Sequence, residues 1–92
     1  MVFKVFKLQM ALKDKENREK AKILKKLSEH IVKLRKEQGI TSAEFARRCD
    51  MERSNIVRIE TGRANLTFYN LLRIAKALKI SVSELIKDFD EK

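Results

Sequence analysis

The stretch TSAEFARRCDMERSNIVRIETG, residues 41–62, decides the fold. It holds two amphipathic segments of about eight residues each, and the small side chain of Ala46 in the first would let the second cross it closely. The apolar residues of both segments fall at helical spacing and are Phe45, Ala46, Cys49, Ile56 and Ile59. This pattern predicts a helix-turn-helix unit, in which the second helix projects outward from the first.

Helix signals continue on both sides of this unit. Upstream, apolar residues three or four positions apart run from Leu24 to Leu34, and Gly39 suits a left-handed cap after them. Downstream, Thr67 and Ser81 each stand where a helix N-cap is expected, ahead of a further apolar pattern. Together the signals predict an all-α fold of five helices without a sheet.

The segment before these helices is more ambiguous. Apolar residues alternate from Phe6 to Leu12, as in a strand, yet no other segment of the chain reads as a strand. The segment is therefore compatible with a strand that pairs with a second copy, with the start of a helix, or with a flexible arm. Polar residues 13–22 fit a solvated helical turn or linker that leads into the next helix. We divide the chain into a basic N-terminal extension, residues 1–22, and a helix-turn-helix domain, residues 23–92.

The charge pattern points to a polyanionic partner. The net charge is +9, and residues 1–26 alone hold nine basic and three acidic residues, a net of +6. Guanidinium groups bind phosphates and guanine edges through paired hydrogen bonds that lysine cannot form. Five arginines and no lysine lie in one short stretch, at Arg47, Arg48, Arg53, Arg58 and Arg63. This clustering favours nucleic acid as the partner.

The second helix of the unit is the candidate element for contacting DNA bases. Ile56 and Ile59 anchor this helix from behind. Its outward positions are Arg53, Ser54, Val57 and Arg58. A projecting helix of this width fits the major groove of B-DNA, where arginine can bind guanine O6 and N7. The alternative is an ordinary helical hairpin with solvated arginines on its outer side.

At this point the sequence resembles a known family. The matching segments are LRKEQGIT at 34–41, EFA at 44–46, RSNIVRIETGR at 53–63 and LLRIAKALKISVSELI at 71–86. In order and spacing they resemble the lambda-repressor-like helix-turn-helix domain of the Cro and Xre type. The resemblance covers residues 27–89 and implies a sequence-specific regulator of transcription that binds a palindromic operator in double-stranded DNA.

The resemblance also implies roles for individual residues. The recognition helix would span about residues 52–61, with Arg53, Ser54, Asn55 and Arg58 facing bases. An ion pair between Arg35 and Glu60 would join the first and third helices. The residues at positions where the family contacts phosphates are Ser42, Thr61, Arg63, Asn65 and Thr67.

Three positions depart from the family pattern. Ser42 replaces a glutamine that holds a phosphate, so we expect a weaker contact there, aided by the helix N-terminus. Asp50 replaces the glycine of the turn, and aspartate tolerates the left-handed conformation better than most residues. Glu52 replaces a serine or threonine N-cap and is the poorer cap.

Two surfaces are candidates for a homodimer interface, and both could instead close the monomer core. The first is the fifth helix, and the second is the apolar N-terminal segment. A different function would use the same fold mainly to bind a protein partner, as an antitoxin-like protein or adaptor. The basic extension and the missing glutamine favour that alternative, and the outward arginines oppose it. The candidate dimer residues are Phe3, Val5, Phe6, Val82, Leu85, Ile86 and Phe89.

Enzymatic chemistry is not expected. The one histidine, His30, has no paired nucleophile, and the sequence shows no phosphate-binding glycine loop. We expect no catalytic residues, no metal site and no cofactor. Cys49 is the single cysteine and fits a buried structural role. Lys4 and Lys7 interrupt the apolar N-terminus, so we expect no membrane span and a cytoplasmic location.

Overall fold

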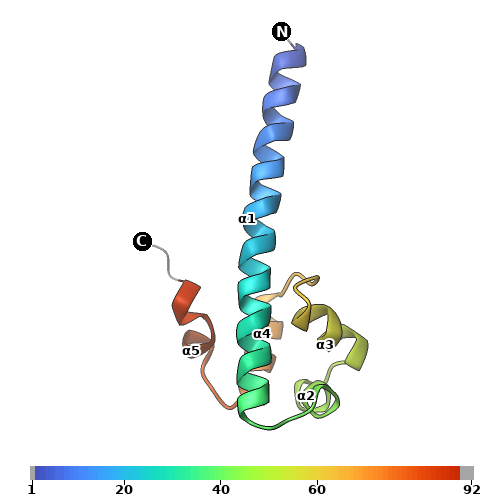
Figure 1. Ribbon diagram of the computed structural model, residues 1–92, viewed down its shortest axis with the longest axis vertical. Coiled ribbons are helices and arrows are strands. Elements are labelled where there is room, and N and C mark those ends of the chain that lie inside the picture. Colours follow the sequence, from blue (N-terminus) through green and yellow to red (C-terminus); the bar gives the residue numbers. More distant parts are fainter. Residues whose placement is uncertain (1, 90–92) are drawn as a thin grey trace.

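The computed structural model describes residues 2–89, and the side chains at positions 2–4 and 6 lie outside that description. Within residues 2–89 the chain is helical and contains no strand, which confirms the predicted all-α fold (Figure 1). The elements are α1 (Val2–Glu37), α2 (Ser42–Cys49), α3 (Arg53–Glu60), α4 (Phe68–Ala77), α5 (Val82–Ile86) and a closing 3-10 turn (Lys87–Phe89).

Helix α1 decides among the three alternatives for the N-terminus. It runs through 36 residues without a break, so residues 2–22 form a helix rather than a strand or an irregular arm. The segment lacks glycine and proline, and a helix pairs its own backbone groups where a lone strand would find no partner. The boundary that we drew between residues 22 and 23 lies inside this helix. Its first half rises well above the other helices (Figure 1) and gives the molecule a longest dimension of 56 Å.

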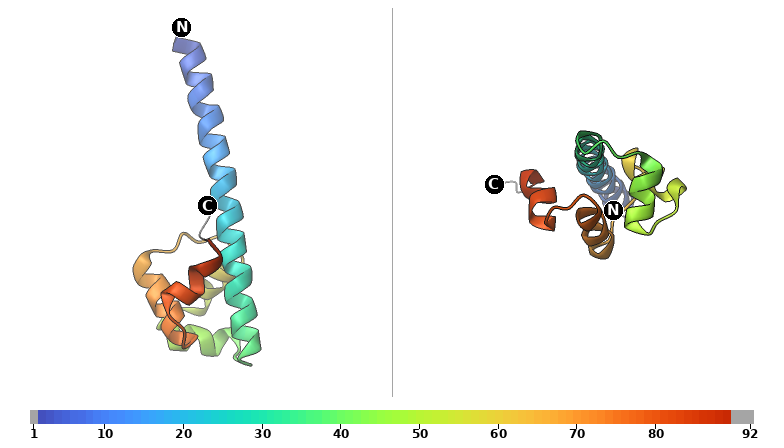
Figure 2. Two further views of the ribbon diagram at one scale, coloured as in Figure 1. Left: turned by 90° about the vertical axis from the view of Figure 1, so that its left-hand side faces the viewer. Right: turned by 90° about the horizontal axis from the view of Figure 1, so that it is seen from below.

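The core lies where the second half of α1 meets the other four helices. In Figure 1, α3 and α5 lie on opposite sides of α1, and the view from below shows α4 across from α1 (Figure 2). Leu27 and Ile31 of α1 are buried there, together with residues from every other α-helix. The largest fully buried side chains are Ile31, Phe45, Cys49, Ile56, Ile74, Leu78 and Leu85.

Helix starts follow the capping residues in the sequence. Thr41 accepts a hydrogen bond from the backbone N–H of Glu44 at 3.1 Å, and Ser81 accepts one from Glu84 at 3.0 Å. Thr67 accepts one from the N–H of Asn70 at 3.1 Å. Each cap satisfies a backbone donor that has no partner inside its helix, and thereby fixes where α2, α4 and α5 begin.

Two helix ends use the left-handed conformation without glycine. Asp50, between α2 and α3, has φ 54° and ψ 47°, as its short polar side chain allows. Lys79, after α4, has φ 60°, and no sequence signal marks this turn because lysine rarely adopts the left-handed conformation. The next residue, Ile80, donates its N–H to the carbonyl of Ala75 at 3.0 Å, and this bond closes the end of α4.

Candidate nucleic-acid interface

Helix α3 is anchored on one face and open on the other. Ile56 and Ile59 are buried beneath it, whereas Arg53, Ser54 and Arg58 are exposed. Asn55, the fourth residue predicted to face bases, is half-buried. The helix lies at one side of the molecule (Figure 1), and its exposed face is polar and partly cationic.

A nearly buried ion pair holds the end of α3 against α1. Arg35 donates from Nε to Glu60 Oε1 at 2.9 Å and from Nη2 to Oε2 at 3.1 Å, and each side chain is 11% exposed. Arg35 also donates from Nη1 to the carbonyl of Ile40 at 2.8 Å. With its guanidinium and carboxylate both satisfied, the pair fixes the angle of α3 and neutralises a carboxylate close to the candidate interface.

Ser42 joins this ion pair. Its hydroxyl donates to Glu60 Oε1 at 3.4 Å, so the structure places the serine as a brace between α2 and the end of α3. Its position as the first residue of α2 also leaves it among backbone N–H groups at a helix N-terminus, where anions are favoured.

The five clustered arginines divide into two groups. Arg47 and Arg48 both bind the carboxylate of Glu44 on α2, and their hydrogen bonds hold the pKa of that carboxyl below its usual range. Arg53, Arg58 and Arg63 are exposed and form no ion pair within residues 2–89. The three arginines on and after α3 therefore keep their charge available for an outside partner.

The loop after α3 contains four of the five predicted phosphate-binding residues. Arg63 and Asn65 are exposed there. Thr67 uses its oxygen as the acceptor that caps α4, so its hydroxyl proton is available to a phosphate. Thr61 instead donates its hydroxyl to the carbonyls of Val57 and Arg58, at 2.8 and 3.2 Å, and would have to rotate to bind a phosphate.

The start of α3 is weakly capped. Glu52 occupies the N-cap position with φ −68° and ψ 146°, but its side chain makes no capping hydrogen bond. Together with Ser54, Asn55 and Arg58 it lines a hollow of about 290 Å³ on the outer side of α3. The hollow therefore contains an exposed carboxylate beside the arginine that the sequence assigns to base reading.

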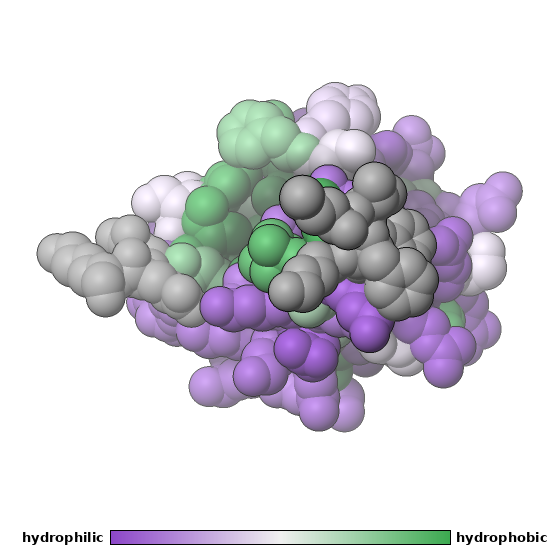
Figure 3. Space-filling view, turned by 90° about the horizontal axis from the view of Figure 1, so that it is seen from above, coloured by the Kyte–Doolittle hydropathy of each residue, from purple (hydrophilic) through white to green (hydrophobic). Residues whose placement is uncertain are grey.

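An apolar face lies away from α3, over α4 and α5. Phe68 and Tyr69 are each 66% exposed, Leu72 is 44% exposed, and Ile86 is 38% exposed. Beside them, a groove of about 530 Å³ is lined by Leu72, Ala75, Lys76, Ile80, Ser81 and Val82. In the view along α1, hydrophobic residues gather on one side of the molecule, opposite a hydrophilic side (Figure 3).

The predicted dimer residues fall into different environments. Leu85 is fully buried and has no surface to offer, whereas Val82 and Phe89 are half-buried. Val5 is exposed on α1, and the side chains of Phe3 and Phe6 lie outside the described residues. Sequence reasoning missed the first turn of α4, where Phe68 and Tyr69 follow the cap Thr67.

The next features are the possible metal ligands and the single cysteine. No group of three or more His, Cys, Asp or Glu side chains gathers to bind a metal within residues 2–89. Cys49 is buried, and this burial raises the pKa of its thiol to about 11. No described helix is long and apolar enough to cross a membrane.

A braced helix with an open cationic face, following a capped helix and a tight turn, defines the class of helix-turn-helix proteins. Residues 31–85 match a family model described as helix-turn-helix, and the chain belongs to this family in its Cro/Xre type. Membership of this family and the names of its relatives support a DNA-binding regulator.

Three relatives agree with this assignment. The control protein C.MunI from a Mycoplasma species is 40% identical over 60 residues, which cover 64% of this chain and 81% of that protein. An uncharacterized HTH-type transcriptional regulator, y4dJ, from Sinorhizobium fredii is 33% identical over 67 residues, covering 73% and 87%. The restriction-modification controller protein C.AhdI from Aeromonas hydrophila has a TM-score of 0.66 at 31% identity, covering 67% and 94% of the two chains.

Proposed function

We propose that this protein is a transcriptional regulator that binds a palindromic DNA operator as a homodimer and reads it through α3. The observation that carries the proposal is the state of Arg53 and Arg58. Both are exposed and make no ion pair with any described residue, and they lie on a helix braced by Arg35 and Glu60. A rigid helix fixes the backbone positions from which these side chains reach the DNA, and each arginine can pair with a guanine edge.

Residues around α3 would then fix its register in the groove. Arg63, Asn65 and Thr67 follow the helix in one exposed loop, and Ser42 stands at the N-terminus of α2. Contacts from such positions bind the phosphate backbone and orient the protein, whereas Arg53, Ser54, Asn55 and Arg58 would carry the sequence preference.

The homodimer would form on the apolar face of α4 and α5. Four exposed large hydrophobic residues lie there, and a second copy could cover them: Phe68, Tyr69, Leu72 and Ile86. A twofold axis at this face leaves both α3 helices open, and two recognition helices about 34 Å apart would read half-sites one helical turn apart.

The controller class is the regulatory role that we propose. C.MunI is named as a control protein and C.AhdI as a restriction-modification controller. If this chain has the same role, its operator should lie upstream of genes of a restriction-modification system in the genome that encodes it. An operator located only beside unrelated genes would contradict this assignment and leave DNA binding intact.

The test is selection of duplexes from a random library by the purified full chain at near-physiological salt. We expect enrichment of a palindrome and its loss in the Arg53→Ala, Arg58→Ala double variant, since each arginine contributes roughly 1–3 kcal/mol of discrimination. The control is Arg47→Ala, Arg48→Ala, which removes the same charge from arginines bound to Glu44. Enrichment of no sequence by the wild type would contradict the proposal.

Light scattering tests the dimer separately. Leu72→Gln with Ile86→Gln should shift the protein toward a monomer at micromolar concentration. Leu8→Gln with Leu12→Gln makes the same chemical change on the N-terminal half of α1 and should leave the dimer intact. The opposite pattern would move the interface to the N-terminal segment.

A protein partner is the second candidate function. Val5, Leu8, Met10 and Leu12 are each more than half exposed on the projecting part of α1, at 55%, 61%, 53% and 54%. Such a helical surface suits a partner's apolar groove, as in an antitoxin-like protein or adaptor. This candidate predicts that the random-library selection enriches no site.

A further inference from the structure

The middle of α1, from its projecting part down to the loop after α3, carries a line of cations that the proposed function has not used. Lys15, Arg18, Lys22 and Lys25, here called the basic stripe, follow one another at intervals of three, four and three residues. Residues at this spacing share one face of a helix. All four are exposed and form no ion pair within residues 2–89.

The basic stripe begins beside the loop that follows α3. A Cβ added to Gly62 would lie 3.4 Å from Cα of Lys25, so the turn after α3 packs directly against this part of α1. The next residue, Arg63, is exposed and is one of the proposed phosphate-binding residues. The stripe is therefore continuous with the proposed DNA interface rather than separated from it by the core.

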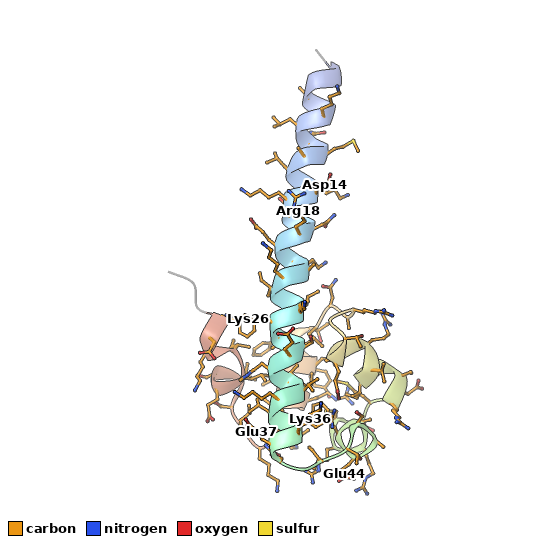
Figure 4. All side chains as sticks on the ribbon, viewed as in Figure 1. Asp14, Arg18, Lys26, Lys36, Glu37 and Glu44 are labelled. Carbon is orange, nitrogen blue, oxygen red and sulfur yellow. The ribbon has the colours of Figure 1, made fainter. Side chains whose placement is uncertain are left out.

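From Lys25 the stripe leads away from the domain toward the N-terminus. Arg18 lies on the part of α1 that rises above the other helices (Figure 4). At a rise of 1.5 Å per residue, the distance from Lys25 to Lys15 is about 15 Å, which corresponds to roughly four base pairs of duplex at about 3.4 Å each.

We propose that the basic stripe binds phosphates of the DNA that flanks the operator half-site, on the side of the loop after α3. This inference rests on the proposed function and extends its footprint. Cations at these intervals repel one another and weaken an isolated helix, and a line of phosphates would relieve that repulsion while releasing counterions. The continuity with Arg63 favours the same duplex over a separate polyanion.

Acidic neighbours limit the charge of the stripe. Asp14 comes four residues before Arg18 and borders the stripe (Figure 4). Asp14→Asn should therefore strengthen binding to DNA that includes the flank, a gain opposite in sign to the effect of removing a stripe cation.

The other faces of the same segment provide a matched control. Lys13 and Lys20 are exposed and lie within residues 13–22, but their helical positions fall on the side of α1 away from the stripe. The double variants Arg18→Gln, Lys22→Gln and Lys13→Gln, Lys20→Gln remove equal charge from one helix, so only the location of the lost charge differs. Circular dichroism should show equal helix content in both.

The experiment compares two duplexes, the selected operator alone and the operator with ten added base pairs on each side. We expect the wild type to bind the long duplex more tightly than the short one. Loss of Arg18 and Lys22 should abolish this advantage and lower the slope of log K against log salt by about two on the long duplex. The Lys13, Lys20 variant should keep most of the affinity advantage for the long duplex and most of the salt slope.

The outcomes separate the two proposals. Two results would overturn this inference and leave the proposed function standing. In the first, the wild type selects an operator but binds the short and long duplexes with equal affinity. In the second, the two double variants lose equal affinity for the long duplex. Failure of the wild type to select any operator would overturn the proposed function and this inference together.

Discussion

The two halves of α1 form one continuous helix in two different environments. In the second half Leu27 and Ile31 are 7% and 0% exposed against the other helices, whereas Leu8 and Leu12 in the first half are 61% and 54% exposed. Tertiary packing stabilises the second half, and the first half depends on its own helix propensity, since isolated helices in water are marginal. The second half of α1 therefore stabilises the fold, whereas the first half leaves its side chains exposed to solvent.

The largest expected effect is the difference in stability between two truncations, one in each half of α1. Ile31→Ala leaves a cavity in the core and should lower the free energy of unfolding by roughly 2–5 kcal/mol. Leu8→Ala should change it by less than about 0.5 kcal/mol, because little burial is lost. Urea denaturation of both variants measures the difference, and equal losses would show that the first half is packed in solution.

The second comparison concerns ion pairs in the core and on the surface. Glu60→Ala leaves the guanidinium of Arg35 nearly buried without its carboxylate and should destabilise the fold by about 3 kcal/mol. Glu44→Ala breaks the exposed pairs with Arg47 and Arg48 and should cost much less. A small loss in Glu60→Ala would mean that the ion pair does not hold α3 in place.

Helix caps should give smaller effects of opposite sign. Thr41→Ala removes the acceptor for the N–H of Glu44 and should cost about 1 kcal/mol. Glu52→Ser supplies a cap where α3 has none and should add up to about 1 kcal/mol. Thermal unfolding of both variants checks the signs, and destabilisation by Glu52→Ser would show that the glutamate has another role at the start of α3.

The smallest expected effect concerns the thiol of Cys49, which lies in the packed region. Burial raises the pKa of Cys49 from 9.0 to about 11, against the opposing charge of Arg73. The neutral thiol is favoured in the fold, so this contribution to stability is present below about pH 9 and is lost as the pH rises toward 11. At pH 8 a disulfide reagent should react slowly with Cys49 in folded protein.

A cysteine in the other half of α1 supplies the contrast. In an Ala11→Cys variant the new thiol would lie on the exposed half and should react at once under the same conditions. Equal rates at the two positions would contradict the burial of Cys49.

Much of the fold could be predicted because its signals are local. Thr41, Thr67 and Ser81 mark helix starts, and the apolar spacing around Ile56 marks the face that is buried. The N-terminus could not be assigned because residues 2–12 fit two periodicities, and only the lack of a partner strand excludes a sheet. The left-handed Lys79 had no signal, since its conformation follows from how α4 must end.

Less of the candidate site than of the fold could be predicted from the sequence. The exposed positions of Arg53 and Arg58 follow from helical spacing, and the resemblance placed Arg35 opposite Glu60. Glu44 lies three and four residues before Arg47 and Arg48, a spacing that allows ion pairs on a helix. The structure was needed to separate these paired arginines from Arg53, Arg58 and Arg63. That Leu85 is buried while Leu72 is exposed depends on how α4 and α5 cross, which periodicity does not specify.

The most direct test of the central claim is a nuclear magnetic resonance titration of the ¹⁵N-labelled full chain with the selected operator and with a scrambled duplex of equal length. We predict that the operator shifts the amides of α3, of the loop after it and of Ser42 far more than the scrambled duplex does, and leaves those of α4 and α5 little changed. Equal shifts with both duplexes, or shifts that leave α3 unaffected, would contradict a regulator that reads DNA through this helix.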